Sequence, residues 1–284
     1  LYGLSGISGL GNEAVTISDT TSAANVSGIL SKTSGVVTAT VTSDTAASLN
    51  SALTNTTGND ALTLTVTGTA AATDLTALDG KTSVNVGATA VTTITGTQAQ
   101  VVAINVGTIT TSGNYAVTLS DTSLSAAAIK TVNTQNGTGA IDISSVTTIT
   151  SSTAADVLEI VNNTNSTFTT AANYAVTLSG ISSASDVNTI VNDTTGIVTA
   201  TVTEATAASL NSALANASST DALTLTLTDT ALASADDLIA LDGKTSVTVN
   251  AGSVTSVTDT YADINTLYGL SGISGLGNEA VTIS

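Results

Sequence analysis

The chain has 284 residues and contains no Cys and no His. This composition excludes disulfides, thiolate nucleophiles, and the imidazole ligands and bases on which many metal sites and enzymes depend. Its formal net charge of −17 opposes binding to nucleic acid, because such binding requires cationic side chains that neutralise phosphates.

Short runs rich in Val, Ile and Thr predict a series of β-strands. In chain order the strands form three successive series, which we call passes. They are a first pass (14–115), a shortened second pass (116–174) and a third pass (175–279). The predicted strands are 14–18, 36–41, 61–66, 83–86, 91–95, 116–120, 140–144, 146–150, 175–179, 197–202, 222–227, 246–250, 254–258 and 280–284. Most successive strand–helix repeats begin about two dozen residues apart. The longer intervals contain Gly-rich segments, which we expect to bulge from one edge or to add a local strand.

Between the strands, apolar residues follow the spacing of a helix face. In residues 45–53 the pattern is TAASLNSAL, with Asp44 or Thr45 placed to cap the first turn. Asp242-Gly243 supplies a turn after the last of these segments. The predicted helical segments are 45–53, 154–161, 186–191 and 236–241.

Alternation within the strands predicts two different faces. In residues 61–66, Leu62, Leu64 and Val66 point one way, whereas Thr63 and Thr65 point the other. We expect the aliphatic rows to meet the helices and the Thr rows to form an outer face.

Residues 1–18 recur unchanged as residues 267–284, which gives a period of 266 residues (267 − 1). The chain starts at Leu1 and stops inside a repeat, so we expect an excerpt from a tandem array. We interpret residues 1–284 as one continuous segment in which 267–284 restart the period.

A strand–helix unit repeated at this spacing predicts an α/β repeat fold. The expected form is a right-handed parallel β-solenoid with short helices between the strands, similar to leucine-rich repeats. An alternative is an all-β array of tandem sandwiches, prompted by passes of about a hundred residues. The shortened second pass argues against it, because a sandwich does not readily lose half its strands.

Few residues suggest a chemical site. Carboxylates recur at turns, and we name four as weak calcium candidates, Asp44, Asp60, Asp221 and Asp242. Helix capping explains them at least as well. No motif for nucleophilic catalysis, phosphate binding or dinucleotide binding is present, so we predict no enzyme activity, no catalytic residue and no resident cofactor. The Thr rows resemble ice-binding faces, although they are irregular.

The motifs VVTATVT, ALTLTVTGTAAATDLTALDGKTSVNV, VTTITGT and GNEAVTIS resemble repeats of giant tandem-repeat secreted or cell-surface proteins of bacteria. The resemblance is strongest to the cyanobacterial swimming-associated surface protein type, and it covers essentially the whole chain. It implies an extracellular structural or adhesive role, and it transfers no functional residue.

From these observations we predict a structural repeat segment of an extracellular fibre, sheath or surface-layer protein. Its partners would be further copies of itself and a cell surface or matrix, with no nucleic acid and no membrane span in this segment. The alternative function is an adhesin extender, or a binding face for glycan, surface or ice carried by the Thr rows.

Overall fold

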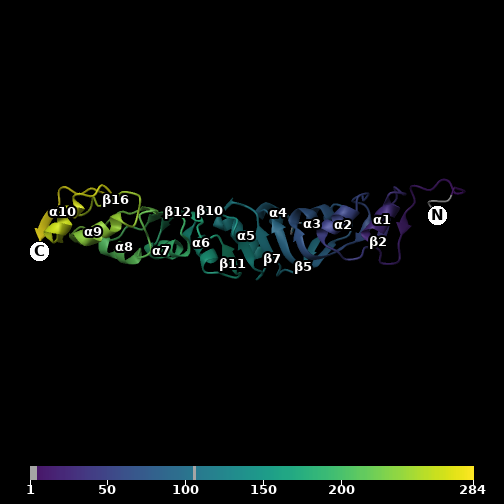
Figure 1. The fold of residues 1–284 in the computed structure, drawn as a ribbon, viewed down its shortest axis with the longest axis horizontal. Coiled ribbons are helices and arrows are strands. Elements are labelled where there is room, and N and C mark those ends of the chain that lie inside the picture. Colours follow the sequence, from purple (N-terminus) through teal and green to yellow (C-terminus); the bar gives the residue numbers. More distant parts are fainter. Residues whose placement is uncertain (1–4, 105–106) are drawn as a thin grey trace. The chain divides into compact units, whose positions relative to one another are not determined.

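The structure is a computed structural model that describes residues 5–104 and 107–284. It is an α/β fold in which helices alternate with strands along the chain (Figure 1). The chain divides into two compact units. One comprises Leu1–Asp121, Thr131–Ser145 and Asn165–Thr169, and the other comprises Thr122–Lys130, Val146–Thr164 and Thr170–Ser284.

The first unit contains two parallel sheets, with strand orders β1-β2-β3 and β11-β9-β7-β5-β4; β6 also pairs with β5. Its elements are β1 (Val15–Thr16), α1 (Ala23–Leu30), β2 (Val37–Thr40), α2 (Ala46–Ala52), β3 (Ala61–Thr63), β4 (Thr65–Ala71), α3 (Ala72–Asp79), β5 (Val86–Gly96), α4 (Gln98–Ala103), β6 (Ile109–Thr111), β7 (Ala116–Leu119), β9 (Ile141–Ile143) and β11 (Phe168–Thr170). Helix α5 (Ala126–Gln135) contributes residues to both units.

The second unit contains three parallel sheets, with strand orders β14-β13-β12-β10-β8, β15-β17-β19 and β16-β18. Its elements are β8 (Ser123–Leu124), β10 (Thr148–Ser152), α6 (Ala154–Val161), β12 (Ala175–Ser182), α7 (Ala184–Asp193), β13 (Val198–Val202), α8 (Ala207–Ala213), β14 (Ala222–Thr224), β15 (Leu232–Ser234), α9 (Ala235–Asp242), β16 (Val249–Asn250), β17 (Ser256–Asp259), α10 (Tyr261–Leu267), β18 (Ile273–Ser274) and β19 (Ala280–Ile283).

The strand register confirms the spacing predicted from the sequence. Val15 pairs with Val37 in the first unit, and Ser256 pairs with Ala280 in the second, so each strand meets the strand about two dozen residues later. The Gly-rich intervals add local strands, as predicted: β6 pairs with β5, and β18 pairs with β16.

The predicted faces are also confirmed. Leu62, Leu64 and Val66 are at most 1% exposed, whereas Thr63 and Thr65 are exposed. Burial of aliphatic side chains against the helices is the main force that holds such layers together. Among the described residues, the core is built almost entirely from Val, Ile, Leu and Ala, whose small side chains suit thin repeating layers.

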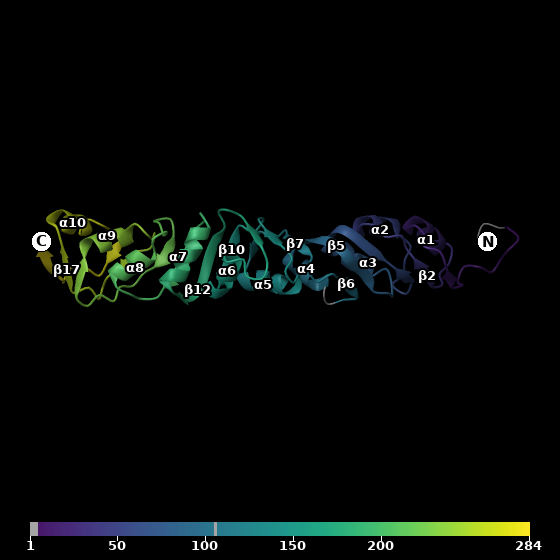
Figure 2. The same cartoon turned by 90° about the horizontal axis from the view of Figure 1, so that it is seen from below.

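The helices begin where the sequence places their caps. Helix α2 begins at Ala46, and its cap residue Thr45 accepts the backbone N–H of Ser48 at 3.2 Å. Helix α6 matches its predicted range, and α7 and α9 extend slightly beyond theirs. In the first unit α1 packs beside α2, and α2 beside α3 (Figure 2).

The alternative of all-β sandwiches is wrong. Immunoglobulin-type sandwiches are built from antiparallel strands, whereas the strand pairs that the structure describes are parallel and separated by helices. Within residues 5–104 and 107–284, no helix combines the length and hydrophobicity needed to cross a membrane.

Candidate functional site

Asp60 joins two successive strands of the first unit. It is 1% exposed and lies in the turn before β3. Its Oδ1 accepts the backbone N–H of Val37 in β2 at 2.9 Å, and its Oδ2 accepts the N–H of Thr57 at 2.7 Å. The carboxylate therefore fixes its own turn and also holds the start of the preceding strand.

Asp221 repeats this arrangement in the second unit. It is 3% exposed and accepts the N–H of Val198 in β13 at 3.1 Å and the N–H of Ser218 at 3.0 Å. Hydrogen bonds to a buried carboxylate are among the stronger ones in proteins. The same device thus occurs at corresponding places in both full passes.

Two buried threonines extend the connection by one further strand. Thr82 Oγ1 accepts the N–H of Leu62 at 2.9 Å and donates to the carbonyl oxygen of Leu62 at 2.8 Å. Thr245 makes the matching bonds to Leu223, at 2.9 and 2.7 Å. We call Asp60, Thr82, Asp221 and Thr245 the strand latches, because each joins its own strand–helix repeat to the preceding strand.

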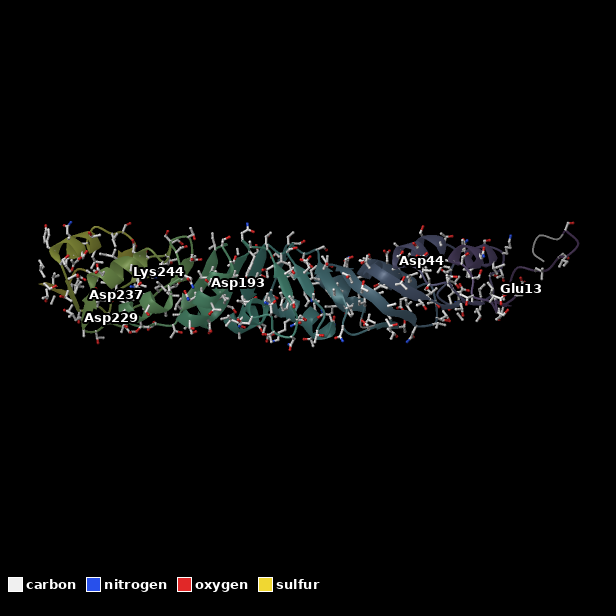
Figure 3. The ribbon with its side chains drawn as sticks, turned by 60° about the horizontal axis from the view of Figure 1, so that its bottom comes forward. Glu13, Asp44, Asp193, Asp229, Asp237 and Lys244 are labelled. Carbon is white, nitrogen blue, oxygen red and sulfur yellow. The ribbon has the colours of Figure 1, made fainter. Side chains whose placement is uncertain are left out.

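The lysines that follow α3 and α9 cap the C-terminus of the helix in the preceding strand–helix repeat. Lys81 Nζ donates to the carbonyl oxygens of Asn50, at 2.9 Å, and Leu53 at the end of α2. Lys244 Nζ donates to the carbonyl oxygen of Leu214 at the end of α8, at 2.9 Å (Figure 3). Cations at a helix C-terminus satisfy open carbonyls and oppose the helix dipole favourably.

Acidic side chains also cap the starts of helices that belong to the preceding strand–helix repeat. Asp121 accepts the N–H of Gln98 at the start of α4, at 2.6 Å. Asp229 accepts the N–H of Ala207 at the start of α8, at 2.8 Å. Each of these two helix starts therefore receives a negative group from the following strand–helix repeat. This group interacts favourably with the helix dipole.

Among the described residues, none of the four calcium candidates belongs to a group of three acidic side chains that could share a metal ion. Asp60 and Asp221 are strand latches whose oxygens accept N–H donors. Asp44 is exposed (Figure 3), and its Oδ1 accepts the N–H of Thr45 at 2.7 Å. Asp242 lies half-buried at the end of α9. Calcium binding by these residues stays a prediction.

A different acidic cluster forms in the second unit. Among the described residues, Asp236, Asp259 and Asp263 make the one group of three acidic side chains whose oxygens lie within 4.8 Å of one another. Repulsion from Asp259 raises the pKa of Asp236. Hydrogen bonds, first from Ser234 and then from backbone N–H groups, lower the pKa of Asp259. Asp259 Oδ2 accepts the Ser234 hydroxyl at 2.9 Å, so this carboxylate also serves the start of α9.

Two further titratable groups connect neighbouring elements. Hydrogen bonds to Glu159 and Asp156 raise the pKa of Lys130, which links α5 to α6 at 2.6 and 3.4 Å. Burial raises the pKa of Tyr174, and its hydroxyl donates to Asp193 at 2.6 Å. Both tyrosine and lysine therefore keep their protons at neutral pH and act as donors.

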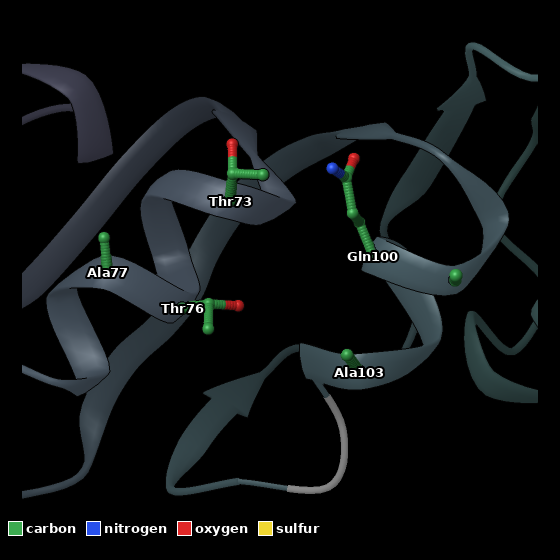
Figure 4. A pocket seen from close by; sticks show the side chains of 6 residues that line it. Thr73, Thr76, Ala77, Gln100 and Ala103 are labelled. Carbon is green, nitrogen blue, oxygen red and sulfur yellow. The ribbon is translucent and has the colours of Figure 1, made fainter.

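A hollow of about 470 Å³ lies between α3 and α4 in the first unit (Figure 4). The described side chains that line it are small or neutral, and none of them titrates in the physiological range. It is lined by Thr73, Thr76, Ala77, Ala99, Gln100 and Ala103. Its chemistry does not suggest proton transfer or nucleophilic attack.

The role of the latch threonines was not predicted from the sequence. The signal was present, because ALDGKTSV occurs at 77–84 and again at 240–247, with the buried Thr directly after the capping Lys. Comparison of the chain with family models, curated proteins and solved structures finds no match.

Proposed function

We propose that this chain is a structural repeat segment of an extracellular fibre, sheath or surface-layer protein. In this proposal successive units form a right-handed parallel solenoid, similar to leucine-rich repeats, whose role is extension, cohesion and self-assembly. Stability in such an array is carried by contacts between neighbouring units, so it accumulates along the chain.

The observation that carries this proposal is the repeated use of strand latches. Asp60 and Asp221 hold the preceding strand through the N–H groups of Val37 and Val198, and both carboxylates are almost completely buried. A buried polar group costs free energy unless it is fully bonded. The use of buried carboxylates to join neighbouring strand–helix repeats favours a molecule whose main role is cohesion.

The second candidate function is adhesion through the Thr rows. Thr16 pairs with Thr38 and Thr40 pairs with Thr63, so threonines do align across strands. However, Ala61 lies opposite Thr38 on the next strand, which interrupts the row. An ordered lattice of hydroxyls over a wide face is what ice or glycan recognition would require, and this row is short.

Charging the Thr face separates the two functions. For the double substitution Thr63→Lys and Thr65→Lys we expect the free energy of unfolding to change by less than about 1 kcal/mol, because both side chains are exposed. We expect self-assembly, measured by light scattering, to be retained. A matched control is Leu64→Lys, which places a charge at a buried position between the two and should unfold this region.

Loss of a measurable binding activity in the double variant, with folding intact, would support adhesion instead. The assays are inhibition of ice recrystallisation and binding to a glycan array. Unchanged behaviour of the double variant in every assay agrees with a structural segment.

A further inference from the structure

Buried threonines fasten turns in the first and third passes. Thr33 follows α1 and donates its hydroxyl to the carbonyl oxygen of Glu13 at 2.7 Å. Thr194 follows α7 and donates to the carbonyl oxygen of Tyr174 at 2.6 Å. Both hydroxyls also accept the backbone N–H of the residue two positions later, at 3.0 and 2.9 Å. Each of these buried hydroxyls therefore has a partner both as donor and as acceptor.

The shortened second pass places a less well bonded side chain after α5. The buried residue there is Asn136, whose Nδ2 donates to the carbonyl oxygens of Tyr115 at 3.3 Å and Gly139 at 2.7 Å. These two donations fix the orientation of the amide. Among the described residues, the Oδ1 of this fully buried side chain has no hydrogen-bond partner. A buried acceptor without a donor lowers the stability of the surrounding structure.

The turn after α6 is fastened by a longer bond. Its buried side chain is Ser166, whose hydroxyl donates to the carbonyl oxygen of Gly137 at 3.4 Å. The corresponding bonds of Thr33 and Thr194 measure 2.7 and 2.6 Å. Hydrogen bonds between oxygens weaken as they lengthen beyond about 3.0 Å. The turns of the second pass are therefore held less firmly by their buried polar side chains.

Backbone strain is concentrated in the same pass. Strands β4, β10 and β12 each contain an irregularity at which the register shifts. In β4 and β12 the residue with positive φ is a glycine, Gly68 at +76° and Gly180 at +74°, whereas in β10 it is Ser151 at +36°. The other non-glycine residues with positive φ in the described chain are Asn163 and Asn165. A residue with a Cβ is strained in this region, and glycine is not.

The ion pairs of the second pass do not offset these features. Lys130 lies 3.4 Å from Asp156 and 2.6 Å from Glu159, but its side chain is 45% exposed. Ion pairs between exposed groups contribute little to stability.

We propose that residues 136–166, which we call the opening segment, open before the latched repeats of the first and third passes. Opening means that the inter-strand bonds of β9 and β10 break while the repeats held by the strand latches stay folded. Proteins open locally in the parts where stability is lowest. Such a segment lets the chain lengthen under load without unfolding its full passes. This use rests on the structural role proposed above, whereas the opening itself does not.

Amide hydrogen exchange of the full chain, measured residue by residue, compares two matched bonds. Ile141 donates its N–H to the carbonyl oxygen of Thr167, and Val176 donates to that of Ile197, both at 2.9 Å. Both donor residues are at most 1% exposed. Because the bonds match, a difference in exchange reports the opening of the surrounding structure. We expect Ile141 to exchange roughly 5–30-fold faster than Val176.

Exchanging the residues at the strand irregularities tests the cause. Ser151 is exposed, so Ser151→Gly relieves strain with little loss of packing. We expect it to slow exchange in β10 roughly 3-fold. Gly180→Ser is the matched reverse change, because a Cβ there has nothing within 4 Å and adds strain without a clash. It should speed exchange in β12 by a similar factor.

The outcomes separate the opening segment from the proposed function. Equal exchange at Ile141 and Val176 would overturn the opening segment, whatever the state of assembly. Unchanged exchange of β10 in Ser151→Gly would overturn strain as its cause. Light scattering measures assembly independently. Absence of assembly, with fast exchange at Ile141, would overturn the structural role and the use of the segment under load, while supporting the opening itself.

Discussion

Replacing Asp60 by Ala is expected to lower the free energy of unfolding by about 2–4 kcal/mol. The substitution leaves the buried N–H group of Val37 and the N–H group of Thr57 without their acceptor. Asp221→Ala should cost a similar amount, because its bonds to Val198 and Ser218 match those of Asp60. Chemical denaturation monitored by circular dichroism gives the total loss, and amide hydrogen exchange of Val37 or Val198 locates it.

Two comparisons make this result specific. Glu204→Ala removes a carboxylate that is exposed, and it should change the free energy of unfolding by no more than about 0.5 kcal/mol. Asp60→Asn keeps the shape but places an amide group among N–H donors, so it should recover only part of the loss. If Asp60→Ala behaved like Glu204→Ala, the latch would not contribute to cohesion.

Gly196→Ala is the second substitution with a large expected effect. A Cβ at this position would overlap the carbonyl oxygen of Tyr174 and lie 2.6 Å from that of Asn173. The backbones approach closely here because Thr194 donates to the same Tyr174 oxygen at 2.6 Å. Since backbone cannot move aside cheaply, we expect a loss of about 3 kcal/mol in the free energy of unfolding.

A glycine in an open position provides the matched control. Gly28 lies within α1, is exposed, and has nothing within 4 Å of the place where a Cβ would be. Gly28→Ala should therefore stabilise the chain by up to about 1 kcal/mol, since Ala is the better helix former. Opposite signs for Gly28→Ala and Gly196→Ala, measured by thermal and chemical unfolding, are the expected outcome. Equal effects would contradict the close packing around Gly196.

Much of the secondary structure follows from the sequence because two simple patterns coincide. The alternation of Leu62, Thr63 and Leu64 identifies both a strand and its buried face. The position of Thr45 before the apolar spacing of 45–53 identifies a helix start. Strand β15 was missed, because a run as short as Leu232–Ser234 carries too little pattern to be separated from a turn.

The latches could not be predicted from the sequence in the same way. Asp60 looks like any turn carboxylate, and its importance depends on burial and on an N–H donor that lies 23 positions earlier in the chain. The cluster of Asp236, Asp259 and Asp263 likewise forms only because α9, β17 and α10 bring distant carboxylates together. Contacts between neighbouring strand–helix repeats depend on the strand register, and local sequence patterns do not specify that register.

The measurement that tests the central proposal most directly is electron cryo-microscopy of assembled material. A stacked strand–helix solenoid predicts continuous density with a rise of about 4.8 Å for each unit of about two dozen residues. It also predicts that density continues from the strand at 280–284 into a strand equivalent to 37–40. Separate beads of about a hundred residues joined by linkers, as in an array of sandwich domains, would contradict the proposal.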